Sequence, residues 1–251
     1  MVHEQQYNRP MRAVTISREY GSGGGEIAAR LAQRLGWRLI DHELIRQVAR
    51  LLGESEVEVS RQDEHVEPFI VRLLEGARWL SPWTATAQSV SLEDEGARYH
   101  QTVSQVIETA YRTGEVVIVG RSSQVLLGPH RDVLHLRVVA PLEQRVSYVA
   151  RREGRTPGDA RKRIEQKDAD RAHYLTEYYH QRPDDVHLYD LVINTGVLSL
   201  DDAVDLSLLA LQRKGDRLAV PAGKLGPVSG LAPYPGRPGD LMPSENGDGS
   251  K

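Results

Sequence analysis

The chain has 251 residues, of which 39% are hydrophobic and 27% charged, and its formal net charge is −3. A slightly acidic chain carries no overall basic field, so we expect no nucleic-acid partner. The absence of cysteine excludes disulfides and thiolate metal sites and is typical of a reducing compartment. We therefore expect a cytoplasmic protein, with no membrane span, because no stretch approaches the roughly 18 apolar residues that a span needs.

Short apolar segments alternate with helical patterns along the chain. Strands are predicted, in chain order, at 13–16 (AVTI), 38–40 (RLI), 116–119 (VVIV), 133–139 (VLHLRVV) and 191–193 (LVI). Helices are predicted between or after them, at 26–35, 142–152 and 199–212. This alternation indicates βαβ units, and the nearly all-aliphatic strands are typical of a parallel sheet covered on both faces. The fold class that we predict is an α/β parallel sheet flanked by helices.

We expect one domain over residues 12–213, after a flexible N-terminus at 1–11. Residues 55–113 contain no convincing strand and predict a helical insertion, and the region 151–172 reads as a lid because Pro157 and Gly158 break the helical pattern there. Residues 214–251 hold six of the 13 prolines and eight of the 22 glycines. Such a composition buries little apolar surface, so we predict a disordered tail.

A glycine-rich segment, residues 17–26 (SREYGSGGGE), joins the first predicted strand to the first predicted helix. Glycine allows positive φ and a close approach of the backbone to a ligand, and a helix N-terminus directs N–H groups toward an anion. We therefore expect this segment to bind the phosphates of a donor nucleotide through Gly21, Ser22, Gly23, Gly24 and Gly25. The alternative is a βα turn without a ligand.

The segment departs from the phosphate-loop pattern G-x-x-x-x-G-K-S/T, whose lysine contacts the β- and γ-phosphates and whose hydroxyl contacts Mg²⁺. When Gly23 is laid on the second glycine of the pattern, Gly24 takes the lysine position and Gly25 the hydroxyl position. Arg18, or an arginine from elsewhere, would have to supply the missing charge. Glu19 and Glu26 are the carboxylates that we predict for Mg²⁺, which prefers oxygen ligands.

Two further features are candidates for the same site. Arg163, Lys167 and Arg171 recur at every fourth residue and share one helix face, where they could neutralise transferring phosphates. The alternative is a solvated basic face. Asp41 follows the second predicted strand and either orders magnesium-bound water or caps the next helix.

Six segments, in order and spacing, resemble the cytidylate kinases. They are 17–25 (SREYGSGGG), 38–41 (RLID), 116–121 (VVIVGR), 140–145 (APLEQR), 167–172 (KDADRA) and 189–195 (YDLVINT). The chain resembles more closely a cytidylate-kinase-like family with a glycine loop of this altered type, over roughly residues 12–213. The resemblance implies a P-loop fold with a mobile lid and ATP-dependent phosphoryl transfer to CMP or dCMP with Mg²⁺.

The resemblance also implies roles for individual residues. Arg121 would contact the phosphate or base of the acceptor, and Asp168 and Arg171 would hold its sugar and phosphate, with Asp41 grouped beside them. Arg145, Arg151 and Arg152 would lie near the arginines that clamp the transferring phosphate. Together with Arg18, which would supply the missing loop charge, they are the predicted catalytic residues. Ser122 stands where cytidylate kinases have Asp, so the acceptor stays open between CMP or dCMP and another phosphate-bearing small molecule. The alternative function is a nucleotide- or phosphate-binding regulatory module with weak or no catalysis.

Overall fold

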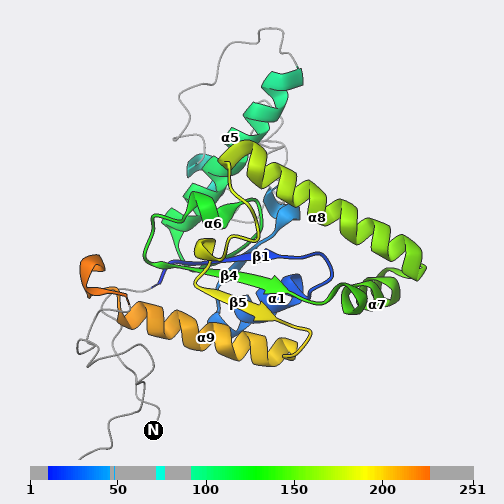
Figure 1. Ribbon diagram of the computed structural model, residues 1–251. Helices are drawn as coiled ribbons and strands as arrows, with labels where there is room; N and C mark the ends of the chain where they lie inside the picture. The colour runs from blue at the N-terminus through cyan, green and yellow to red at the C-terminus, as the bar shows by residue number, and fades with distance from the viewer. Residues whose placement is uncertain (1–10, 46–47, 49–71, 77–91, 227–251) are drawn as a thin grey trace, which may run out of the picture.

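The computed structural model describes residues 11–45, 48, 72–76 and 92–226 (Figure 1). Its strands form one sheet in the order β2-β3-β1-β4-β5, and all neighbours are parallel. The strands are β1 (Ala13–Arg18), β2 (Arg38–Ile40), β3 (Val116–Val119), β4 (Val133–Val139) and β5 (Leu191–Asn194). The predicted α/β parallel sheet is confirmed, and each strand lies where its apolar segment predicted it.

Helices cover both faces of the sheet, with α1 and α9 on one face and α5 and α6 on the other (Figure 1). The helices described over their full length are α1 (Gly24–Leu35), α5 (Leu92–Thr113), α6 (Ser123–Leu126), α7 (Leu142–Glu153), α8 (Pro157–Tyr179) and α9 (Leu200–Asp216). Short 3₁₀ turns, η2 (Val186–Leu188) and η3 (Ala222–Lys224), follow α8 and α9. Among the described helices, none is long and apolar enough to cross a membrane.

The core follows the two-residue period of the strands. Val14 and Ile16 of β1 are fully buried against the α1 and α9 side, whereas Ala13 belongs to the cluster on the α5 side. Successive strand residues point to opposite faces, so a sheet covered twice needs aliphatic side chains at almost every position. Each such side chain contributes about 1.5–3 kcal/mol when it is fully buried, and together they fix the sheet.

The parallel register brings chemically useful side chains to one edge of the sheet. Ser17 at the end of β1 is paired with Arg137 of β4, and Ile16 is paired with Val119 of β3. The residues that follow, from Arg18 and Gly120 onward, therefore emerge side by side at the carboxyl ends of the strands. This edge is where open α/β sheets bind ligands.

Contacts with the domain continue past residue 213, where the predicted domain ends. Helix α9 continues to Asp216, and Lys214 Nζ lies 2.5 Å from Asp190 Oδ2. Arg131 Nη2 donates to the carbonyl oxygens of Arg217 and Val220, at 3.0 and 2.7 Å. The first residues of the predicted tail, as far as Val220, thus contact the domain, because their backbone carbonyls find a partner that composition does not reveal.

Several predicted regions extend outside the described residues. These are the N-terminus up to residue 10, the tail from 227 onward and most of the predicted insertion at 55–113. Within that insertion, α5 is helical as expected. In the predicted lid region, α7 and α8 form a helix pair joined by a short turn, and Thr156 caps α8 by accepting a hydrogen bond from Asp159 N.

Candidate active site

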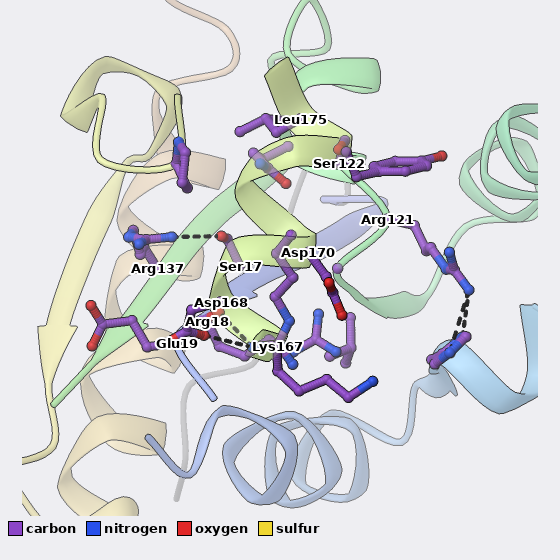
Figure 2. A pocket seen from close by; sticks show the side chains of 17 residues that line it. Ser17, Arg18, Glu19, Arg121, Ser122, Arg137, Lys167, Asp168, Asp170 and Leu175 are labelled. Carbon is purple, nitrogen blue, oxygen red and sulfur yellow. Dashed lines mark hydrogen bonds and ion pairs between the residues drawn. The ribbon is translucent and has the colours of Figure 1, made fainter. Parts of the chain in front are cut away.

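A cavity of about 440 Å³ opens at the carboxyl ends of β1, β3 and β4 and is bordered by α8 (Figure 2). Its volume falls within the range of small-molecule sites. The charged side chains that line it are five cations, Arg18, Arg121, Arg137, Lys167 and Arg171, and three anions, Glu19, Asp168 and Asp170. The surplus of cations, mostly arginines that can form paired hydrogen bonds with oxyanions, suits a phosphate-bearing ligand.

The glycine loop lies next to this cavity, between β1 and α1. Gly21 and Gly23 have φ of 82° and 80°, and a Cβ on Gly23 would lie 2.6 Å from Leu200 Cδ2. Both the left-handed backbone and the packing against α9 therefore require glycine at position 23. Ser22 is buried, and its hydroxyl lies 2.9 Å from Glu19 O and 3.1 Å from Val138 O, so its side chain shapes the loop.

None of the residues Gly21 to Gly25 lines the cavity itself. The first N–H groups of α1 have no intrahelical acceptor, as at any helix start, and Gly24 and Gly25 provide two of them. Binding of donor phosphate by this loop stays a prediction.

Asp168 is the centre of a polar network that joins α8 to the loop. Its Oδ1 accepts from Tyr20 N at 2.7 Å, and its Oδ2 accepts from Arg145 Nη1 at 2.6 Å. Arg145 is buried and also donates through Nε to Ala140 O at 2.9 Å. These contacts hold α7, α8 and the loop together, and contact of the two residues with substrate stays a prediction.

Arg171 continues this network from α8 toward β1. Its Nη1 donates to the backbone oxygen of Arg18 at 3.2 Å and lies 3.3 Å from Asp168 Oδ1. The guanidinium groups of Arg163 and Arg171 lie 5.6 and 5.4 Å from the centre of the Tyr20 ring. Burial lowers the pKa of Arg171, and the carboxylate of Asp168 opposes this shift. The predicted basic face of α8 thus contacts the loop, and Arg171 also borders the cavity.

A strained turn follows β3 on the opposite side of the cavity. Gly120, Arg121 and Ser122 have φ of 76°, 57° and 55°, and the two non-glycine residues in this left-handed conformation cost of order 1–3 kcal/mol each. Arg121 Nη2 donates to Tyr99 OH at 3.0 Å and lies 2.6 Å from His42 Nδ1. The turn therefore holds the predicted acceptor-binding arginine at the rim of the cavity.

Asp41 caps the helical residues 42–45. Its Oδ1 accepts hydrogen bonds from Glu43 N at 3.0 Å and from Leu44 N at 2.9 Å. It does not border the cavity. Of the two roles that the sequence left open, the structure shows the cap.

The remaining predicted catalytic arginines lie outside the cavity. Arg151 and Arg152 are on α7, where Arg152 bonds to Tyr148 and Glu26. Tyr148 OH in turn donates to Glu26 Oε1 at 2.6 Å. Contact of these arginines with a transferring phosphate stays a prediction.

The carboxylates predicted for magnesium are both bonded to protein groups. Glu26 is held by α7, and Glu19 Oε2 accepts from Ala140 N at 3.1 Å. Within the described residues, no group of three or more His, Asp or Glu side chains could hold a metal ion. Gly25 brings no hydroxyl to the loop, and binding of Mg²⁺ by Glu19 and Glu26 stays a prediction. In many kinases Mg²⁺ is bound chiefly by water and substrate phosphates, with one or two carboxylates.

Most of the cavity residues were not among the predicted site residues, and three of them, Arg137, Gln124 and Tyr174, carry polar groups of particular interest. Arg137 donates from Nη1 to Ser17 Oγ at 3.0 Å, and its position two residues after His135 in an otherwise aliphatic strand was a usable signal. Gln124 Oε1 and Tyr174 OH are buried and have no hydrogen-bond partner among the described residues. Burial also raises the pKa of Tyr174. These two come from α6 and α8, and no sequence pattern brings them together.

Residues 13–197 match the profile of the cytidylate kinase-like family. The chain belongs to this family. A cytidylate kinase of Pyrobaculum aerophilum is 28% identical over 200 residues, which cover 79% of this chain and 91% of that protein. A uronate isomerase of Corynebacterium glutamicum is 30% identical over 130 residues, but these cover 52% of this chain and only 24% of that protein.

Among solved structures, an uncharacterized protein from Eubacterium ventriosum matches with a TM-score of 0.58 and 19% identity. The match covers 80% of this chain and 98% of that one, and it shows a shared fold. The family relationship supports nucleotide-dependent phosphoryl transfer in general.

Proposed function

We propose that this protein transfers the terminal phosphoryl group of ATP to a nucleoside monophosphate of the CMP or dCMP type, or to a related phosphate-bearing small molecule. The observation that carries this proposal is the cavity lined by five cationic side chains beside a glycine loop. Phosphoryl transfer needs positioning and charge neutralisation more than covalent help from the protein. The family membership supports the same reaction class.

In the proposed reaction, an ionised oxygen of the acceptor phosphate attacks the terminal phosphorus of ATP. The new P–O bond forms as the bond to the bridging β–γ oxygen breaks, and ADP and a nucleoside diphosphate result. Because the attacking oxygen is already ionised, the site needs no general base. Arg121 and Arg171 would neutralise the acceptor phosphate from opposite sides of the cavity.

A regulatory phosphate-binding module is the second candidate. It is favoured by the missing loop lysine and hydroxyl, and by Asp168 and Arg145 being bonded to the protein rather than left for substrate. The same cavity would then bind a nucleotide or another phosphate compound without turnover. Fold alone does not decide between the two.

The test is to incubate the protein with ATP, Mg²⁺ and a panel of nucleoside monophosphates, and to separate the nucleotides by chromatography. We expect ADP to form together with one nucleoside diphosphate. The Arg171→Met variant should reduce turnover by about 10- to 100-fold, since a charge-assisted contact contributes roughly 1.5–3 kcal/mol.

Arg30→Met is the matched control. Arg30 pairs with Asp201 at 2.6 Å on the α1 and α9 side of the sheet, so this variant also loses an ion pair, but one remote from the cavity. Turnover should be close to that of the unmodified protein. Saturable binding of ATP without any diphosphate product would reject the kinase and favour the regulatory module.

A further inference from the structure

The side chain of Arg18 runs between two glycines that belong to different segments. A Cβ on Gly24 would lie 2.7 Å from Arg18 Cβ and 3.1 Å from its Cγ. A Cβ on Gly120 would lie 1.9 Å from Arg18 Nη1 and 3.0 Å from its Cζ. Real Cβ atoms do not come this close to other atoms, so both positions must lack a side chain for Arg18 to adopt its path.

This path explains the altered phosphate loop. With Gly24 at the lysine position of the pattern G-x-x-x-x-G-K-S/T, Arg18 stands at the first glycine. The basic residue and the glycine have therefore exchanged places relative to the standard loop. The Cβ of a lysine at position 24 would collide with the Cβ and Cγ of Arg18. The loop can therefore accommodate either Arg18 or a lysine at position 24, but not both.

The guanidinium group of Arg18 reaches the junction between the glycine loop and the strained turn after β3. Among the described residues, no hydrogen bond or ion pair is formed by this group, although it borders the cavity. Burial, with Arg171 and Arg121 nearby, lowers the pKa of Arg18 to about 9 in spite of Asp41 and Asp168. A cation that is desolvated and unpaired is unfavourable in the empty protein, and an anionic ligand would satisfy it.

We propose that Arg18 replaces the phosphate-loop lysine and binds the terminal phosphates of the donor nucleotide, and that Gly24 and Gly120 are glycines to make room for it. The inference rests on the proposed function, since it names the residue that holds the donor. An arginine in this place offers paired N–H donors on a planar group, where lysine offers a point charge.

The first experiment compares the unmodified protein with Arg18→Met, using ATP and inorganic tripolyphosphate as probes in calorimetric titrations. The variant removes the charge and keeps much of the stem. We expect its affinity for both probes to fall by about 10- to 100-fold. Tripolyphosphate has no base or sugar, so an equal loss for both probes assigns the contact to phosphate.

Melting curves of the ligand-free proteins separate this role from a structural one. If Arg18 is a half-buried cation without a partner, Arg18→Met should melt at the same or a higher temperature than the unmodified protein. A lower midpoint with unchanged affinity for both probes would show that Arg18 supports the fold and would overturn the inference.

The second experiment restores the standard order of residues in the loop. Gly24→Lys alone should lower both the melting temperature and the ATP affinity, because the new stem collides with Arg18. The double variant Arg18→Gly/Gly24→Lys removes the collision and should bind ATP more tightly than either Gly24→Lys or Arg18→Met. If the double variant binds ATP no more tightly than the two single variants, the proposed exchange of the basic residue and the glycine between positions 18 and 24 is contradicted.

These outcomes are distinct from failure of the proposed function. If the unmodified protein binds neither ATP nor tripolyphosphate, the proposed function itself is rejected and this inference falls with it. If it binds both, and Arg18→Met binds them equally well, the kinase proposal stands and Arg18 is not the replacement for lysine.

Discussion

Helices α8 and α9 are both long, with 23 and 17 residues, but different forces hold them in place. Helix α9 buries Ala203, Val204, Ser207 and Leu211 against the sheet and α1. Helix α8 buries only three residues over its greater length, and polar contacts of Asp168 and of the arginines on its surface connect it to the glycine loop.

Helix α9 is therefore a structural element of the domain, whereas the position of α8 depends on its polar contacts with the candidate active site. Apolar burial responds little to salt, whereas attraction between partly exposed charges is screened by it. We therefore expect α9 to unfold only with the whole domain and α8 to respond to ionic strength and to bound phosphate. Three predictions test this contrast, from the largest expected effect to the smallest.

The largest effect is expected for Leu211→Ala in α9. Leu211 is 7% exposed, and the cavity left by its truncation should lower the free energy of unfolding by about 2–4 kcal/mol. Urea titrations at about 0.05 and 0.5 M salt should give the same loss. A loss under about 1 kcal/mol would show that α9 is not fixed by apolar packing at this point.

The second prediction concerns the stability of the protein at low pH and the role of His135 in β4, a strand that contacts α9. Lys214 of α9 bonds to Asp190, and Asp190 Oδ2 accepts from His135 N at 2.8 Å. The imidazole of His135 is buried, with Nδ1 2.8 Å from Thr15 Oγ1. Burial, reinforced by Lys214 and opposed by Asp190, lowers the pKa of His135 to about 4.

Because this pKa lies below the ordinary value of about 6.5, the unfolded state binds more protons than the folded state at pH values between these two pKa values. The contribution to stability is complete above about pH 6.5 and is lost as the pH falls toward 4, up to about 3 kcal/mol. Urea titrations across this range should show the decline, and His135→Gln, which cannot titrate, should reduce its slope. An unchanged slope in the variant would assign the acid sensitivity to other groups.

The smallest effect is expected for Asp168→Asn in α8. The carboxylate is 28% exposed, so loss of its charge beside Arg145 and Arg171 should cost about 1–2 kcal/mol at low salt and less at high salt. Hydrogen exchange should increase mainly in α8. Asp201→Asn, which affects an exposed pair between α1 and α9, is the control and should change stability by less than about 1 kcal/mol. A salt-independent loss at Asp168 would remove the contrast between the two helices.

Much of the fold could be predicted because local patterns carry it. The strand at 116–119 is wholly aliphatic, and the structure buries all four residues. The helix after the glycine loop was predicted from apolar residues such as Ile27 and Leu31, which are fully buried. The end of the domain was harder to predict, since residues 217–220 are held by Arg131, which lies 86 residues earlier in the chain.

Prediction of the site was less complete, for a definite reason. Asp168 and Arg145 are the residue types that a phosphate site uses, and the sequence could not show that their polar atoms are bonded to Tyr20 and Ala140. Asp41 was left open between a ligand and a cap, and only the positions of the N–H groups of Glu43 and Leu44 decide for the cap. Residue type indicates what a side chain can do, and its neighbours determine what it does.

The sequence by itself determined the α/β class, the order of the strands along the chain and the place of the glycine loop, because hydrophobic period and glycine content act over a few residues. It also showed that the loop lacks its lysine. Only the tertiary structure decided that Arg18 lies across Gly24 and against Gly120, since that contact joins segments about a hundred residues apart. Distances between such segments are set by the parallel register of β1 and β3, which no local pattern encodes.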